Sequence, residues 1–219
     1  GIGCTARASG YLYFDAAHVI HGRAIPFATG LKLVKPNMRV VVLGGDGDLA
    51  AIGGNHLLHA ARRNMDITVI MVNNMVYAMT GGQVAPTTPP EVYTTTTPYG
   101  NPEYPVNAIK LVSVLNANYV ARASVTHPHL IERYVYKALS KEGFSFVEII
   151  STCPEVFGRH LGFKSPVELF NKLKSLVRVK QKPSINESDI VWGDEIVIGE
   201  YVDEDKEGFL RRFMRVCKW

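Results

Sequence analysis

Two stretches of the sequence decide the fold: Arg39-Val-Val-Val-Leu-Gly-Gly-Asp-Gly-Asp48 and Asp66-Ile-Thr-Val-Ile-Met-Val-Asn-Asn74. Each contains a short apolar run rich in Val and Ile, typical of a buried parallel strand, and each ends in polar residues. Residues 49–63, between them, lack Pro and carry apolar residues at helical spacing, which predicts a helix. The order strand, Gly-rich turn, helix, strand brings both polar ends to the edge of a parallel sheet where ligands bind.

The polar residues at these strand ends suit a phosphate and a divalent metal ion. Gly45 and Gly47 allow the backbone to approach a phosphate closely, and a helix start supplies free N–H groups. Asp46 lies at the same place, and a carboxylate beside a phosphate is unfavourable unless a metal ion lies between them. Because the Asp46 carboxylate and the Asn74 carbonyl are hard oxygen donors, they indicate Mg²⁺ bound with a diphosphate. The alternative is a Gly-Asp turn and an Asn-rich turn in an ordinary α/β domain.

Apolar patterns and turn residues predict the elements along the rest of the chain. We expect further helices at 18–33, 107–117, 128–141 and 165–177, the first kinked or interrupted by Pro26. We expect further strands at 119–125, 144–150 and 195–201, and a basic, aromatic tail at 209–219. Residues 87–105 form a long Thr/Pro loop, and loops of this length inside a domain are usually functional.

The composition indicates a soluble enzyme subunit of the cytoplasm. The chain has 219 residues, of which 47% are hydrophobic, enough for one α/β core. The formal net charge of +4 is dispersed, and no basic stripe interleaves with aromatic residues, which argues against a nucleic acid partner. No apolar run approaches the ~20 residues that span a bilayer, so we expect no membrane segment. Three Cys residues, far apart and odd in number, do not predict a disulfide framework.

Further motifs give the chain a family resemblance. Gly-Asp-Gly followed by Asn-Asn at this spacing resembles the thiamine diphosphate fingerprint. The other motifs are Gly1-Ile-Gly-Cys4, His18-Val-Ile-His-Gly-Arg-Ala24, Gly53-Gly-Asn-His56, Tyr77-Ala-Met-Thr-Gly-Gly-Gln83, Thr94-Thr-Thr-Thr-Pro-Tyr-Gly100 and Cys153-Pro-Glu-Val-Phe-Gly-Arg159. With these motifs, residues 1–160 resemble the β subunit of 2-oxoacid:ferredoxin oxidoreductases, most closely the 2-oxoglutarate type (2-oxoglutarate synthase).

The resemblance implies a fold and a division of the chain. The fold class is α/β, a parallel-sheet thiamine diphosphate-binding fold (the diphosphate domain) with helices on both faces. Residues 1–180 are expected to form the domain that binds thiamine diphosphate and Mg²⁺, and residues 181–219 a linker and carboxyl-terminal tail. Because the sequence starts inside a loop motif, we expect this domain to be truncated at its amino terminus.

The resemblance also assigns roles to single residues. Asp46, the Asn74 side chain and the main-chain carbonyl of Val76 are the implied Mg²⁺ ligands. The remaining implied cofactor residues are Gly45, Gly47 and Asp48, which shape the diphosphate loop, and His21, which donates to a phosphate oxygen. The alternative for His21 is a histidine on a helix surface.

Two turn residues and one arginine are the implied contacts of the thiazolium and the substrate. Thr80 and Gln83 follow the metal loop and are expected to face both, with a satisfied polar turn as the alternative. A 2-oxoglutarate enzyme needs a cation for the distal carboxylate, and Arg23 is the candidate, with a surface or interface ion pair as the alternative. Gly81 stands where some relatives of the 2-oxoglutarate type have Lys, so pyruvate and other 2-oxoacids stay open.

The cysteines carry the redox hypothesis. Thiolates ligate iron–sulfur clusters, and Cys4 and Cys153 stand where the family has two of the four ligands of a [4Fe–4S] cluster. The family's other two ligands form a Cys-X-X-Cys that this chain lacks, so we expect them upstream of it. From spacing alone, buried apolar cysteines are the alternative. Cys217 is expected to be an incidental thiol.

The implied activity is oxidative decarboxylation of a 2-oxoacid, 2-oxoglutarate being favoured, to CO₂ and an acyl-coenzyme A. Electrons pass through the cluster to ferredoxin. Because no separate pyrimidine-binding domain is visible in the sequence, an α subunit is expected to supply that domain and the activating carboxylate. Two alternatives stay open: a non-redox thiamine diphosphate decarboxylase or synthase subunit, and a catalytically silent structural or regulatory subunit.

Overall fold

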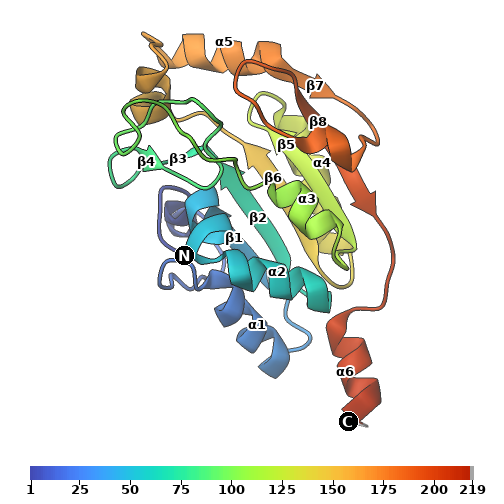
Figure 1. Cartoon of the computed structure of the whole chain (residues 1–219). Helices are drawn as coiled ribbons and strands as arrows, with labels where there is room; N and C mark the ends of the chain where they lie inside the picture. Colours follow the sequence, from blue (N-terminus) through green and yellow to red (C-terminus); the bar gives the residue numbers. More distant parts are fainter. Residues whose placement is uncertain (218–219) are drawn as a thin grey trace.

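The centre of the fold is a six-stranded sheet, drawn in Figure 1 from a computed structural model that describes residues 1–217. Its strands, in spatial order, are β1 (Val41–Gly45), β2 (Thr68–Asn73), β6 (Ser145–Ile150), β5 (Tyr119–Ser124), β8 (Ile196–Asp203) and β7 (Val177–Val179). The first four are parallel, β8 is antiparallel to β5, and β7 is parallel to β8. Two short strands, β3 (Val76–Tyr77) and β4 (Gln83–Val84), pair separately as a hairpin. The predicted parallel sheet is therefore confirmed as a mostly parallel one.

The strands form because both faces of the sheet are buried. Every residue of β5 and β6 is buried, and five of the six in β2 are. Side chains alternate along β2, so Val69 and Met71 enter one core cluster and Ile70 the other. Continuous Val- and Ile-rich runs are what a sheet buried on two sides requires.

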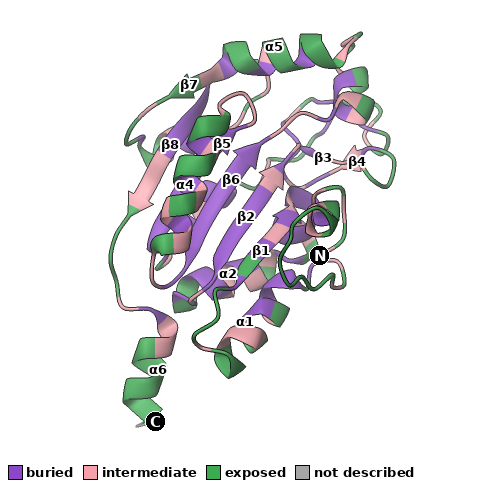
Figure 2. Cartoon of the chain, turned by 180° about the vertical axis from the view of Figure 1, so that it is seen from behind, coloured by how far each residue is buried: buried purple, intermediate pink, exposed green. Residues whose placement is uncertain are grey.

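Helices cover both faces, as predicted (Figures 1 and 2). One face carries α1 (Ala24–Val34), α2 (Gly54–Arg63) and α3 (Ala108–Ser113), and the opposite face carries α4 (Pro128–Ser140). A third cluster, beside the strand ends, includes Leu173 and Leu176 of α5 (Pro166–Leu176). The short helical segments are η1 (Thr5–Gly10), η2 (Gly47–Ile52), η3 (Pro154–Gly158) and η4 (Ile185–Ser188). Within residues 1–217, no helix combines the length and apolarity needed to cross a membrane.

Three predicted helices differ from the structure, and the simplest difference is that the helix expected at 107–117 ends at Ser113. The helix expected at 18–33 begins at Ala24, because Gly22 has a φ of 73°, outside the helical region. Pro26 therefore lies in the first turn, where no intrahelical N–H bond is lost, and neither kinks nor interrupts the helix. The helix expected at 49–63 is divided at Gly53 into a π-helical turn, η2, and α2. The backbone N–H of Gly53 donates to the carbonyl of Asp48, which closes the wider turn.

The carboxyl-terminal part contributes more to the sheet than the sequence indicated. β8 was expected, but its antiparallel pairing with β5 and the presence of β7 were not. The expected tail forms a helix, α6 (Phe209–Cys217), that projects from the body of the molecule in Figure 1; residues 218 and 219 lie outside the described part of the chain. The division of the chain at residue 180 stays a prediction, although β8 continues the sheet beyond it.

Candidate functional site

A cavity of about 840 Å³ opens at the carboxyl ends of β1 and β2. It brings together ten of the twelve residues that the sequence predicted for the site: Cys4, His21, Gly45, Asp46, Gly47, Asp48, Asn74, Val76, Thr80 and Gln83. Arg23 and Cys153 do not line it. The edge of the sheet therefore holds a cavity where the sequence predicted a site.

Asp46 is the buried acid of this cavity. It follows the last residue of β1, and only 2% of its surface is exposed. Burial raises its pKa to about 6, against hydrogen bonds from the Thr87 hydroxyl and nearby backbone N–H groups that lower it. These groups are dipoles rather than full positive charges, so a cation is the partner that the carboxylate lacks.

Asn74 and Val76, on the tight turn between β2 and the start of β3, line the same cavity. Asn74 Oδ1 accepts a hydrogen bond from the Val76 N–H at 3.3 Å, and both residues line the cavity. Met75, between them, has a φ of 64°, and its carbonyl accepts a bond from the Thr88 hydroxyl at 2.7 Å. A carboxylate, an amide oxygen and a main-chain carbonyl are hard donors, so Asp46, Asn74 and Val76 fit Mg²⁺.

Gly47 is required because Tyr77 packs directly against it. A Cβ atom at Gly47 would lie 2.2 Å from Cε1 of the Tyr77 ring. The Tyr77 hydroxyl donates to the Gly47 carbonyl at 3.2 Å, which fixes the ring over the Gly-Asp-Gly loop. Burial raises the pKa of Tyr77, and Asp46 and Asp48 add to this, so the phenol is neutral. A side chain at residue 47 would therefore collide with the Tyr77 ring and displace the loop. With Gly at this position, the loop backbone can approach a phosphate closely.

Asp48 connects the segment before α1 to this loop. Its Oδ1 accepts the Gly22 N–H at 2.6 Å and lies 3.2 Å from Nδ1 of His21. The same His21 nitrogen lies 2.9 Å from the Ile2 carbonyl oxygen. Because a carbonyl can only accept, Nδ1 carries the proton and Nε2 of a neutral ring is an acceptor. His21 can thus donate from Nε2 to a phosphate only as the imidazolium.

Thr80 lies in the turn between β3 and β4, and Gln83 is the first residue of β4. The Thr80 hydroxyl donates to Gln83 Oε1 at 2.6 Å, and Gln83 Nε2 donates to the Thr80 carbonyl at 2.7 Å. The two side chains therefore satisfy each other while they line the cavity. They form the satisfied polar turn that was the alternative, and their contact with the thiazolium and substrate stays a prediction.

Three predicted site residues need separate description. Arg23 is exposed outside the cavity and donates to the Gly22 carbonyl at 3.2 Å. Cys4 lines the cavity and is exposed, whereas Cys153 is 6% exposed in a core cluster with Phe157. In residues 1–217, no three His, Cys, Asp or Glu side chains are grouped so that they could hold a metal ion. The described chain does not supply the ligand set of a [4Fe–4S] cluster, so the cluster role of both cysteines stays a prediction.

Sequence reasoning missed Tyr77 and Thr87. The length of the Thr/Pro loop marked residues 87–105 as functional, but no sequence signal pairs Thr87 with Asp46. The structure shows residues 85–107 without a helix or strand, and the buried Thr87 donates to Asp46 Oδ2 from this loop. Tyr77 lay in a motif of the resemblance, yet only the close approach to Gly47 reveals its position.

Comparisons with known proteins show which family the chain belongs to. Residues 1–149 match the model of the thiamine pyrophosphate enzyme, C-terminal TPP binding domain. The chain is 43% identical over 219 residues to the 2-oxoglutarate synthase subunit KorB of Methanocaldococcus jannaschii, covering 100% of this chain and 80% of that protein. It is 49% identical over 203 residues to the subunit of the same name from Methanothermobacter thermautotrophicus, covering 93% and 71%.

A β subunit and a solved structure extend the comparison. The 2-oxoacid:ferredoxin oxidoreductase 2, subunit beta, of Aeropyrum pernix is 33% identical over 227 residues, covering 99% of this chain and 74% of that protein. The structure of 2-oxoglutarate:ferredoxin oxidoreductase from Magnetococcus marinus, with 2-oxoglutarate, coenzyme A and succinyl-CoA bound, matches with a TM-score of 0.85 at 30% identity, covering 99% of this chain and 75% of that one. The chain therefore belongs to the thiamine pyrophosphate enzymes and, within them, to the β subunits of the 2-oxoacid:ferredoxin oxidoreductases.

Proposed function

We propose that this chain, together with an α subunit, catalyses the coenzyme A-dependent oxidative decarboxylation of 2-oxoglutarate and passes the electrons to ferredoxin. The observation that carries the proposal is the buried Asp46 carboxylate, which faces one cavity together with Asn74 and Val76. The names of the relatives at 43% and 49% identity support 2-oxoglutarate as the substrate.

Thiamine diphosphate and Mg²⁺ are the proposed occupants of the cavity. Asp46, the Asn74 side chain and the Val76 carbonyl would hold the metal ion, and Gly45 and Gly47 would border the diphosphate. When bound, thiamine diphosphate supplies the electron sink that decarboxylation of a 2-oxoacid requires. The protein contributes binding, orientation and electrostatics around it.

The surrounding side chains have distinct proposed tasks. Asp48 and Tyr77 hold the loop in shape, through Gly22 and the Gly47 carbonyl respectively. His21, as the imidazolium, would donate a hydrogen bond from Nε2 to a phosphate oxygen, since its Nδ1 is already bonded to the Ile2 carbonyl. Thr80 and Gln83, already joined to each other, would orient the substrate at the open side of the cavity.

The partners belong to the same proposal. An α subunit would supply the pyrimidine-binding domain and its activating carboxylate, and coenzyme A would take the acyl group. Cys4 and Cys153 would provide two thiolates to a [4Fe–4S] cluster, with the remaining ligands from outside the described residues. A cytoplasmic location, expected from the sequence, is part of this proposal.

Arg23 is the proposed cation for the distal carboxylate of 2-oxoglutarate. Arg23 is exposed and follows Gly22, whose carbonyl accepts from the guanidinium. The Gly22 N–H donates to Asp48, which lines the cavity. Because Arg23 does not line the cavity, its side chain would have to turn toward the cavity to reach the distal carboxylate. Arg23→Met should raise the KM for 2-oxoglutarate more than that for pyruvate, and an equal change for both would reject this role.

The test is viologen reduction by the intact complex, purified without oxygen, with a panel of 2-oxoacids in the presence and absence of coenzyme A. Coenzyme A-dependent reduction that is fastest with 2-oxoglutarate supports the proposal. Preference for another 2-oxoacid retains the reaction and rejects the substrate. Decarboxylation without dye reduction identifies a non-redox enzyme, and a failure to bind thiamine diphosphate rejects the site itself.

A further inference from the structure

We propose that Arg122, Glu148 and Asn73 form a positioning network that fixes the metal-binding turn from behind. The proposal rests on the proposed function, because it concerns the same Mg²⁺ and thiamine diphosphate site. None of the three residues lines the cofactor cavity. Their effect would be exerted through the backbone between Asn74 and Val76.

The two adjacent asparagines have opposite orientations. Asn74 lines the cofactor cavity, whereas Asn73 is 1% exposed and lines a second cavity of about 380 Å³ behind it. Thr87, the partner of Asp46, also lines this second cavity. The second cavity is thus lined by Thr87, which bonds to the proposed metal ligand Asp46, and by Asn73, which precedes the proposed ligand Asn74.

Asn73 acts on the turn directly. Its Oδ1 accepts the Met75 N–H at 3.0 Å, and Met75 is one of three non-glycine residues among the described ones with a positive φ. A bulky side chain avoids this left-handed conformation unless its surroundings impose it. Both backbone groups of Met75 are hydrogen-bonded: its N–H donates to Asn73 Oδ1, and its carbonyl accepts from the Thr88 hydroxyl. These bonds fix the turn that leads to Val76, which lines the cofactor cavity.

Glu148 fixes the orientation of the Asn73 amide. Asn73 Nδ2 donates to Glu148 Oε1 at 2.8 Å, which leaves Asn73 Oδ1 free to accept from Met75. An amide in which nitrogen and oxygen exchanged places would present a donor to the Met75 N–H and an acceptor to the carboxylate. The acceptor at Glu148 therefore selects the one orientation that supports the turn.

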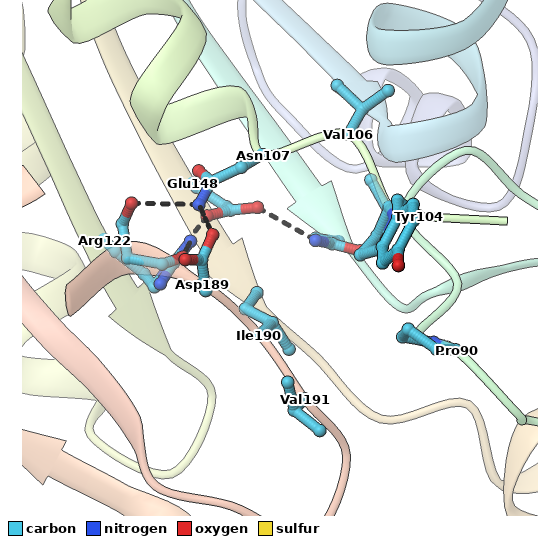
Figure 3. A pocket seen from close by; sticks show the side chains of 13 residues that line it. Pro90, Tyr104, Val106, Asn107, Arg122, Glu148, Asp189, Ile190 and Val191 are labelled. Atoms are coloured by element: carbon cyan, nitrogen blue, oxygen red, sulfur yellow. Dashed lines mark hydrogen bonds and ion pairs between the residues drawn. The ribbon is translucent and has the colours of Figure 1, made fainter. Parts of the chain in front are cut away.

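The Glu148 carboxylate in turn depends on Arg122. Figure 3 shows the two side chains close together in the wall of the second cavity, and they come from neighbouring strands in which Arg122 and Glu148 are in register. Arg122 Nε donates to Glu148 Oε2 at 2.6 Å, and another guanidinium nitrogen donates to the Ser188 carbonyl at 2.9 Å. Each residue is 1% exposed, so neither charge has bulk water as a substitute partner.

The pair is better explained by orientation than by stability. Replacing a buried ion pair with apolar side chains is often neutral or stabilising, because removing two charges from water is costly. A hydrophobic pair at 122 and 148 would satisfy the packing of β5 and β6 but would offer no acceptor to Asn73. The network thus supplies the metal turn with a fixed acceptor that a purely apolar core does not provide.

The test compares two double variants of the intact complex after removal of its cofactor. Arg122→Met/Glu148→Gln removes both charges but keeps an oxygen acceptor for Asn73, and Arg122→Met/Glu148→Leu removes the acceptor as well. Binding of thiamine diphosphate is measured by equilibrium dialysis over a Mg²⁺ series, and the melting temperature is recorded for each variant. We expect the Leu variant to need about 10–100-fold more Mg²⁺ than wild type, the range seen when a residue behind a metal ligand is lost. The Gln variant should stay within a few-fold of wild type.

Equal Mg²⁺ requirements in the two double variants would overturn the proposal, because a merely structural role does not distinguish Gln from Leu in this way. If neither double variant folds, Asn73→Ala decides, since it leaves the ion pair intact. A 10–100-fold rise in the Mg²⁺ requirement of Asn73→Ala supports the proposal, and wild-type binding overturns it. If wild type itself takes up no thiamine diphosphate with Mg²⁺, the proposed function fails first.

Discussion

The Thr87 hydroxyl donates a hydrogen bond to Oδ2 of Asp46 across two loops that are far apart in the sequence. Thr87 is 3% exposed, and Asp46 is 2% exposed. Burial raises the pKa of Asp46 to about 6, and this bond is the largest of the interactions that oppose the rise. Thr87 therefore favours the ionised form of the proposed metal ligand and fixes one of its oxygens.

We predict that Thr87→Val weakens Mg²⁺-dependent binding of thiamine diphosphate by about tenfold, because the carboxylate loses its donor and its fixed orientation. Thr87→Ser keeps the hydroxyl and should bind within a few-fold of wild type. Titration of cofactor-free complex with Mg²⁺ at constant thiamine diphosphate measures both. If the Val variant binds as well as the Ser variant, Thr87 has no such role.

Substitution of Asp46 and substitution of Asp48, on the same loop, are expected to differ in their effects on thiamine diphosphate binding. Asp46→Ala should abolish Mg²⁺-dependent thiamine diphosphate binding, since it removes the carboxylate that faces the cavity. Asp48→Asn keeps an oxygen to accept the Gly22 N–H and should change the affinity by less than about tenfold. The same binding titration compares them, and near-normal affinity of Asp46→Ala would refute the metal assignment.

Gly47→Ala should disturb the diphosphate loop, because its Cβ would overlap the Tyr77 ring. The overlap costs on the order of 1–3 kcal/mol, so we expect thiamine diphosphate affinity to fall about tenfold or more. A second change, Tyr77→Leu, removes the ring and should restore part of the affinity.

Gly30→Ala is the matched control for Gly47→Ala. A Cβ atom at Gly30, on the exposed side of α1, meets nothing within 4 Å. It should leave both binding and melting temperature close to wild type or slightly improved, since Ala favours a helix. Equal losses in the two Ala variants would contradict a steric cause at Gly47.

The three cysteines are expected to separate into two groups. Cys4→Ala and Cys153→Ala should each remove the reduced-cluster signal from the electron paramagnetic resonance spectrum of the complex, because each loses a thiolate ligand. Cys217→Ala should leave the spectrum unchanged, since this exposed cysteine lies on α6. Melting curves check that the buried Cys153 site tolerates Ala. A full signal in either of the first two variants would reject that cysteine as a ligand.

Acid should break the ion pairs that Asp203 of β8 makes with Lys137 of α4 and with Lys141. Hydrogen bonds from Lys137 and then Lys141 hold the pKa of Asp203 below its ordinary value of 3.8. A carboxyl group with a lowered pKa stabilises the fold above the unfolded value, and this contribution is lost as the pH falls below about 4. Asp203→Asn should therefore lower stability at pH 6 by on the order of 0.2–1 kcal/mol, the range for partly exposed ion pairs.

The role of Asp203 is tested by comparing the melting temperatures of wild type and Asp203→Asn across pH. Melting temperatures of wild type and Asp203→Asn should differ by a few degrees between pH 5 and 7 and converge between pH 4 and 2. A difference that persists unchanged at pH 2 would show that the ion pairs are not its source.

The sequence by itself determined the elements that local patterns specify. Apolar runs rich in Val and Ile identified β1 and β2, because strands buried on both sides need such residues, and shorter apolar segments identified β5 and β6 despite the Arg122 and Glu148 within them. Gly-Asp-Gly and Asn74 predicted a site at one edge of the sheet, because the carboxyl ends of parallel strands meet there, and the structure has a cavity at this edge.

The tertiary structure alone decided which distant residues meet. Thr87 reaches Asp46 only because residues 85–107 fold over the strand ends, and Arg122 meets Glu148 only because β5 and β6 are neighbours in register. The antiparallel pairing of β8 likewise follows from a sheet order that no local period encodes. Periodicity reports which faces are buried, whereas contacts between elements depend on the order and register in which the whole chain packs.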